Sequence, residues 1–120
     1  DCGAMKGAMN LGAVDELPHV RDWLDHARAA VEITELKHQK DRNKLLRVTE
    51  ENVLLQMQHL RTHPAVAGRI STGDIGLHGW VYHIDTGEVT CFDDQQSAFL
   101  PIEERYATLL AAQEDAGATA

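Results

Sequence analysis

Apolar residues recur every three or four positions in two stretches of the chain, which is the spacing of an amphipathic helix. The first stretch begins near Pro18, a residue suited to the first turn of a helix, and its stripe comprises Leu17, Val20, Leu24, Ala27 and Val31. The second begins near Val48 or Thr49, and its buried face comprises Val53, Met57 and Leu60. Because Pro64 disfavours helical geometry at the residue before it, this second helix is predicted to end at His63.

Shorter elements are predicted on either side of these helices. The small residues of Cys2–Met9 favour a short helix, and a further turn of helix is predicted through Val66 and Ile70. From Ile75 to Ile84 the chain is rich in β-branched and aromatic residues, and Asp85–Glu88 then forms a turn before the strand Val89–Phe92. This pattern predicts a β-hairpin.

The C-terminal part has a different composition. After Pro101, the segment Glu103–Gln113 has helical composition, and Glu114–Ala120 consists mainly of small residues. Chain ends of this kind are commonly poorly ordered. The sequence therefore predicts a last helix followed by a disordered tail.

Composition narrows the classes of partner. The 120 residues are 43% hydrophobic and 25% charged, which predicts one globular unit with a core. The formal net charge of −8 repels polyanions, so we expect neither a nucleic-acid partner nor an anionic membrane. No window approaches the ~20 apolar residues of a membrane helix. A basic cluster, interpreted as a solvated face or loop, comprises Lys37, Lys40, Arg42, Lys44 and Arg47.

The two cysteines have different predicted environments. With no disulfide framework, they indicate a reducing compartment, and the cytoplasm is the expected location. Cys91 lies on a predicted strand and is interpreted as a small buried apolar residue. Cys2 directly precedes a predicted helix, whose partial positive charge favours the thiolate that binds zinc or acts as a nucleophile. By itself, however, a cysteine in this position is more often inert.

The histidines add no clear metal site. His59 and His63 have the i, i+4 spacing of many zinc helices. Pro64 ends the helix there, and the intervening residues lack the glutamate of a metalloprotease, so their helix-terminal position explains them better. The other histidines show no ligand spacing; they are His19, His26, His38, His78 and His83.

Four segments, in this order, resemble the β-class carbonic anhydrases, most closely the bacterial and cyanobacterial members. They are Asp1–Gly7, Leu17–Leu24, Asn52–Pro64 (with its Asn-Val-Leu-Leu-Gln and Leu-Arg-Thr-His-Pro runs) and Leu77–Tyr82. Together they span Asp1 to about Phe92, whereas the chain beyond about Pro101 matches little. The combination is specific for this family because several helix and strand segments match it in the same order along the chain.

The resemblance implies an α/β fold, with a mostly parallel sheet flanked by helices and an antiparallel edge hairpin supplied by Ile75–Phe92. The N-terminal parallel strands of that fold are expected to be missing from this chain. Residues 1–102 would then be the C-terminal part of a β-carbonic anhydrase domain, and residues 103–120 a C-terminal helix and disordered tail. The expected assembly is a homodimer or a higher homo-oligomer.

The resemblance also implies a zinc cofactor and the reversible hydration of carbon dioxide to bicarbonate by a zinc-bound hydroxide. In the family the ligands come from a C-x-D-x-R motif and a later H-x-x-C motif that is followed by glycine. Cys2 and Gly3 match the end of the second motif, and the other ligands are expected before Asp1. Cys2 is therefore the one metal ligand carried over, with no catalytic or other cofactor-binding residue.

We therefore expect this chain to be a fragment of an enzyme. Alone, the fragment should be inactive and poorly folded, because both apolar stripes lack much of their packing surface. Carbon dioxide and bicarbonate are the expected substrates, and a carboxysome is the alternative to free cytosol. The main alternative function is a non-catalytic scaffold or assembly relative of the same fold. An unrelated helical module is a third reading, which absence of the Trp80 strand would favour.

Overall fold

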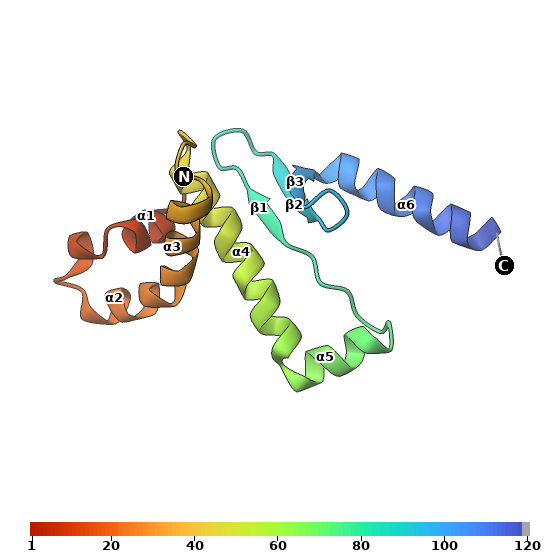
Figure 1. The fold of residues 1–120 in the computed structure, drawn as a ribbon, viewed down its shortest axis with the longest axis horizontal. Helices are drawn as coiled ribbons and strands as arrows, with labels where there is room; N and C mark the ends of the chain where they lie inside the picture. Colours follow the sequence, from red (N-terminus) through yellow and green to blue (C-terminus); the bar gives the residue numbers. More distant parts are fainter. Residues whose placement is uncertain (119–120) are drawn as a thin grey trace. The chain divides into compact units, whose positions relative to one another are not determined.

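The computed structural model describes residues 1–118 (Figure 1). The chain forms two compact units, one of residues Asp1–Leu77 and a second that begins at His78. The first unit is helical and the second is built on a small sheet. Among the described residues, no helix combines the length and apolar character needed to cross a membrane.

The first unit contains five α-helices and two 3₁₀ helices among its described residues. Their bounds are α1 Gly3–Met9, η1 Leu11–Val14, α2 Pro18–Leu24, η2 Asp25–Ala27, α3 Arg28–Lys37, α4 Lys44–Thr62 and α5 Pro64–Ser71. α1 and α5 confirm the short helices predicted near Cys2 and Val66. Figure 1 shows α4 and α5 meeting at a bend, where His63 is extended (φ −72°, ψ 123°), as predicted for a residue before proline.

The single helix predicted from Pro18 to Val31 is wrong, because the chain is interrupted by the 3₁₀ turn η2. This turn separates α2, which packs against α1, from α3, which packs along α4. Leu24 and Ala27 are buried as predicted, but Leu17 is 55% exposed and Val20 44% exposed.

The predicted start of the second helix at Val48 or Thr49 is also wrong, because α4 begins at Lys44. Asn43 caps it, and its side-chain oxygen accepts a hydrogen bond from the Leu46 amide (3.1 Å). This earlier start places Glu50 and Glu51 within the helix, where both are buried. The predicted stripe is only partly buried, since Met57 is buried and Leu60 is 47% exposed.

The core of the first unit is small and made of short side chains. Its buried members are Met5, Ala8, Leu24, Ala27, Ala30 and Val48. They come from α1, the α2–η2 turn, α3 and α4, so these helices approach closely. Some members of the two predicted stripes are exposed, as expected for stripes without a full packing surface; they are Leu17, Val20 and Leu60.

The second unit contains a three-stranded antiparallel sheet in the order β1-β2-β3, with β1 Trp80–Tyr82, β2 Val89–Asp93 and β3 Ala98–Pro101. β1 and β2 confirm the predicted hairpin. Its turn includes Gly87, whose φ of +75° suits glycine. β3 was not predicted, because its four residues show no alternation of apolar and polar side chains.

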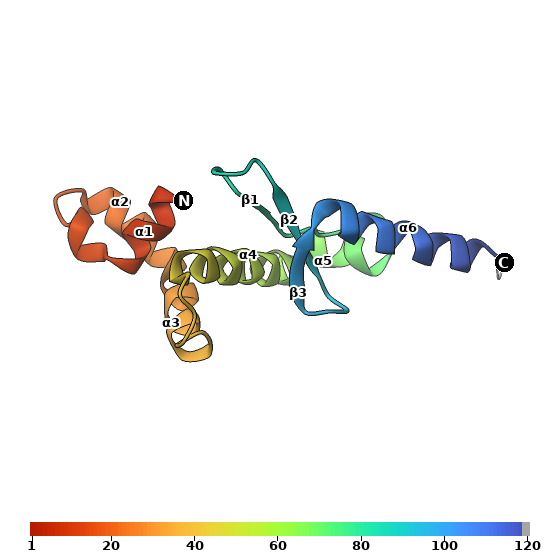
Figure 2. The same ribbon diagram turned by 90° about the horizontal axis from the view of Figure 1, so that it is seen from above.

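The last helix, α6 Ile102–Ala118, follows β3 and packs on β2 and β3 (Figure 2). It is longer than the predicted Glu103–Gln113, and residues 114–118 are helical where a disordered tail was expected. Residues 119–120 lie outside the described residues. The α/β class and antiparallel hairpin agree with the expected fold, and every strand within residues 1–118 is antiparallel. The chain divides into its two units between Leu77 and His78. The boundary after residue 102 that the resemblance implies stays a prediction.

Candidate functional site

Cys2, the predicted metal ligand, lies at the N-terminus of α1. It occupies the N-cap with extended backbone angles (φ −83°, ψ 115°), and its carbonyl accepts a hydrogen bond from the Lys6 amide (3.0 Å). Its side chain makes no capping hydrogen bond. The thiol is free and partly exposed. The sulfur is therefore accessible at the start of the helix, where it could act as a metal ligand.

The position of α1, and hence of Cys2, is set by close packing against α2. Met5 and Ala8 of α1 are buried in the core with Leu24. A Cβ at Gly7 would lie 2.8 Å from Leu24 Cδ1, so any other residue there would force the buried leucine to shift. The side chains of Asp1 and Lys6 form an ion pair on the exposed side. Packing, rather than a cap, thus holds the Cys2 backbone.

The described residues do not by themselves form a zinc site. Within residues 1–118 no three His, Cys, Asp or Glu side chains lie close enough together to hold a metal ion, whereas protein zinc sites use three or four such ligands. Cys2 therefore stands as a single donor. Cys2 has the residue type and the motif position that the family resemblance predicts for a zinc ligand. The other ligands are not found together with it among residues 1–118.

Several predicted polar residues have other structural roles. His38 Nε2 lies 3.2 Å from Glu51 Oε1, and His83 Nε2 lies 3.1 Å from Thr90 Oγ1. Cys91 is buried, as predicted, and burial raises the pKa of its thiol. A raised thiol pKa disfavours the thiolate, so Cys91 is a core residue rather than a nucleophile.

Three members of the basic cluster, Lys37, Lys44 and Arg47, pair with carboxylates. Lys40 and Arg42 are exposed, as predicted for a solvated face or loop. Arg47 donates to Asp41 and Glu50, while Lys37 and His38 face Glu51. The hydrogen bond from Arg47 is the main cause that lowers the pKa of Asp41, and the same bond raises the pKa of the Arg47 guanidinium. The cluster thus joins the end of α3 to the start of α4.

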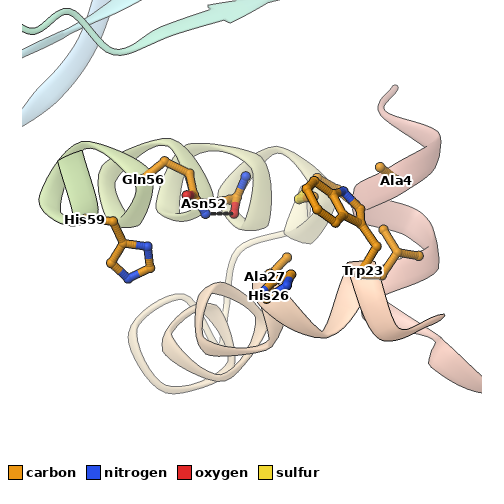
Figure 3. Close-up of a pocket in the computed structure, with 9 residues that line it drawn as sticks. Ala4, Trp23, His26, Ala27, Asn52, Gln56 and His59 are labelled. Carbon is orange, nitrogen blue, oxygen red and sulfur yellow. Dashed lines mark hydrogen bonds between the residues drawn. The ribbon is translucent and has the colours of Figure 1, made fainter. Parts of the chain in front are cut away.

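A groove of about 450 Å³ lies beside α1 in the first unit (Figure 3). Its floor includes Met5, Leu24 and Ala27, and its polar side comes from α4, as Asn52, Gln56 and His59. Trp23 and His26 line the opposite wall, where their rings meet edge to face at 5.5 Å. Sequence reasoning missed this groove. Its one signal was the spacing of Asn52, Gln56 and His59, which share one face of a helix.

The carbonic anhydrase family model matches residues 1–89. The chain belongs to the carbonic anhydrase family. It is 37% identical to a carbonic anhydrase of Synechocystis over 107 residues, which cover 87% of this chain and 39% of that protein. It is also 37% identical to a carbonic anhydrase of Pseudomonas aeruginosa, covering 87% of this chain and 48% of that protein.

The β class is supported by the structure of the β-carbonic anhydrase CcaA, which is similar to this chain with a TM-score of 0.76 and 37% identity. The similarity covers 83% of this chain and 50% of CcaA. The chain thus spans half or less of the length of these relatives. The family model includes all four segments that carry the resemblance and ends at Val89, before most of β2, β3 and α6.

Proposed function

We propose that the protein carrying this chain is a β-class carbonic anhydrase that interconverts carbon dioxide and bicarbonate. The supporting observation is the family match over residues 1–89, which includes Cys2 and the helices that position it. The relatives named carbonic anhydrase share 37% identity over most of the chain. Activity is a proposal because the chain covers half or less of those relatives.

Cys2 is the proposed zinc ligand of this chain. Its partly exposed thiol at the N-terminus of α1 suits a thiolate donor. Zinc, when bound, acts as a Lewis acid and generates a nucleophile from water near neutral pH. The remaining ligands are not among the described residues, so the 120-residue chain alone is proposed to lack the activity.

The proposed assembly is a homodimer or larger homo-oligomer, located in the cytoplasm or in a carboxysome. Exposed apolar side chains on α2 and at its N-cap support the assembly, because such surface favours association. These side chains are Leu17, Val20 and Trp23. A non-catalytic scaffold of the same fold is the alternative function, and the test below separates the two.

The test is a matched pair of cysteine substitutions in the complete protein. Cys2→Ala is expected to remove stoichiometric zinc, measured by elemental analysis, and to abolish carbon dioxide hydration, measured by stopped-flow pH change. Cys91→Ala should retain zinc, because Cys91 is buried in the second unit. Wild-type protein with neither zinc nor hydration activity would favour the scaffold, and full zinc in Cys2→Ala would contradict the ligand assignment.

A further inference from the structure

The contact between Gly7 and Leu24 lies inside the core of the first unit. Leu24 is 7% exposed, and Met5 and Ala8 of α1 are buried in the same cluster. The side chain of Cys2 packs against this cluster as well. The contact is therefore internal to the helices, and it does not depend on which outer surfaces of the unit are covered in the complete protein.

α1 links this contact to Cys2. The helix has seven residues, and its backbone hydrogen bonds hold them as one short element. The Cys2 carbonyl accepts a hydrogen bond from the amide of Lys6 (3.0 Å), the residue next to Gly7. Because the Cys2 side chain makes no capping hydrogen bond, its direction is set by the packing of α1. A displacement of α1 at Gly7 is therefore passed on to the Cys2 sulfur.

The free space at Gly7 is smaller than one methyl group. An added Cβ would lie 2.8 Å from Leu24 Cδ1, whereas ordinary contact begins at 3.4 Å, so the two atoms would have to separate by about 0.6 Å. A metal or catalytic site tolerates displacements of its groups of only about 0.5 Å. Leu24 is buried in the core with Met5 and Ala27, so part of the shift falls on α1.

We propose that Gly7 is a positioning residue for the zinc ligand Cys2. The absence of a Cβ lets α1 approach Leu24 closely enough to place the Cys2 sulfur for metal binding. A larger side chain at this position pushes α1 away from α2 and lowers zinc affinity, although Gly7 itself does not bind the metal. This inference rests on the proposed function, in which Cys2 binds zinc.

The test is a double-mutant cycle in the complete protein, with zinc affinity measured by competition with a chelator. Gly7→Ala is expected to weaken zinc binding about ten-fold, as is common when a residue that orients a metal ligand is changed. In a Leu24→Ala background, where Cδ1 is absent, the same Gly7→Ala change should cost about two-fold or less. An equal loss in both backgrounds would overturn the proposal.

A spectroscopic measurement separates positioning from a general loss of stability. In protein reloaded with cobalt, the absorption band from sulfur-to-metal charge transfer should weaken or shift in Gly7→Ala. Val81→Ala opens the core of the second unit, so it should lower stability and leave the band and the zinc affinity unchanged. Gly68→Ala is the matched glycine control, because a Cβ there meets nothing within 4 Å. Equal loss of zinc in Gly7→Ala and in either control would overturn the proposal.

Circular dichroism checks the fold of each variant. If Gly7→Ala does not fold, the double variant with Leu24→Ala has room for the added methyl group and should fold and retain zinc; its failure to do so would overturn the proposal. Wild type and Gly7→Ala with equal zinc affinity would overturn this inference and leave the proposed function intact. Wild type without zinc would instead contradict the assignment of Cys2, and this inference with it.

Discussion

The two units of this chain use different means to stay ordered. The unit of Asp1–Leu77 has a core of short apolar side chains from several helices, and its two buried glutamates, Glu50 and Glu51, keep side chains that are 12% and 10% exposed beside basic partners. The unit that begins at His78 instead places a carboxylate, Asp93, fully inside. Stability in the first is spread over many small contacts, whereas in the second one buried charged group connects a turn, a strand and a helix.

Asp93 contacts three different elements of the second unit. Its Oδ1 accepts hydrogen bonds from the amides of Gln95 (2.7 Å) and Gln96 (3.0 Å), which closes the turn between β2 and β3. Its Oδ2 has no hydrogen-bond partner among the described residues and lies 3.5 Å from Arg105 Nη1. Arg105 also donates to the Phe92 carbonyl, and the neighbouring Tyr106 meets Trp80 edge to face. The Asp93–Arg105 ion pair is therefore one of several contacts that hold α6 on the sheet.

The largest effect is expected from Asp93→Ala. It removes both turn hydrogen bonds and leaves Arg105, only 14% exposed, without its carboxylate. Breaking a buried pair from one side costs about 3 kcal/mol of unfolding free energy. Urea unfolding followed by Trp80 fluorescence in a Trp23→Phe background measures it. Asp94→Ala, which changes an exposed neighbour, is the control, and equal stability of the two variants would contradict the role of Asp93.

A smaller loss is expected from Val48→Ala in the first unit. Val48 is 1% exposed, and removing its two methyl groups leaves a cavity between α4 and the other core helices. The expected cost is about 2 kcal/mol. Thermal unfolding followed by helical circular dichroism measures it. Leu36→Ala is the control, because Leu36 is 76% exposed. A comparable loss of unfolding free energy in that variant would show that burial of the side chain does not determine the effect.

Gly7→Ala should cost about 1 kcal/mol, since the added Cβ meets Leu24 Cδ1 at 2.8 Å and the buried leucine must shift. Gly3→Ala is matched to it on the same helix, where a Cβ meets nothing within 4 Å. That variant should be neutral or slightly stabilising. Denaturant midpoints of the two variants compare them directly, and a Gly7→Ala protein as stable as Gly3→Ala would mean that α1 and α2 are less tightly packed than described.

The smallest effect concerns the surface pair at the start of α4. The hydrogen bond from Arg47 lowers the pKa of Asp41 below its usual 3.8. A carboxyl with a lowered folded pKa stabilises the protein above its unfolded pKa, and this contribution is lost as pH falls through the folded value. Asp41→Asn should therefore be slightly less stable than wild type at about pH 6, with a difference that shrinks by about pH 3.

Asp22→Asn serves as the control for that pH series, because Asp22 is an exposed carboxylate on α2. Unfolding midpoints of both variants and the wild type are compared across the acid range. An Asp41→Asn difference that does not change with pH would contradict the pairing with Arg47. The expected size is small because exposed ion pairs contribute little.

Local rules predicted several features correctly. Pro64 ended α4 at the predicted place, the turn before Val89 joined two strands, and Cys91 on the second strand was buried. Each depends on neighbours in sequence or on a simple apolar preference. The start of α4 was missed for a local reason as well, because the Asn43 cap was read as part of a polar loop.

The features that were missed depend on residues far apart in the chain. The break at η2 is explained by α2 and α3 packing on different helices, and no residue in Asp25–Ala27 is a helix breaker. The Asp93–Arg105 pair joins residues on different elements, and the groove brings Trp23 to α4. Cys2 was singled out by the family resemblance, since a cysteine in this position is by itself more often inert.

The amino-acid sequence by itself determined the family, most helix and strand positions, and the one residue proposed to bind zinc, because these depend on local periodicity, turn chemistry and motif order. Only the tertiary structure decided which apolar residues are covered, which carboxylate is buried beside Arg105, and that Trp23, Asn52 and Gln56 line one groove. The physical reason is that burial and ion pairing depend on the distance between side chains in space. That distance is set by helix and strand packing, which local sequence patterns do not encode.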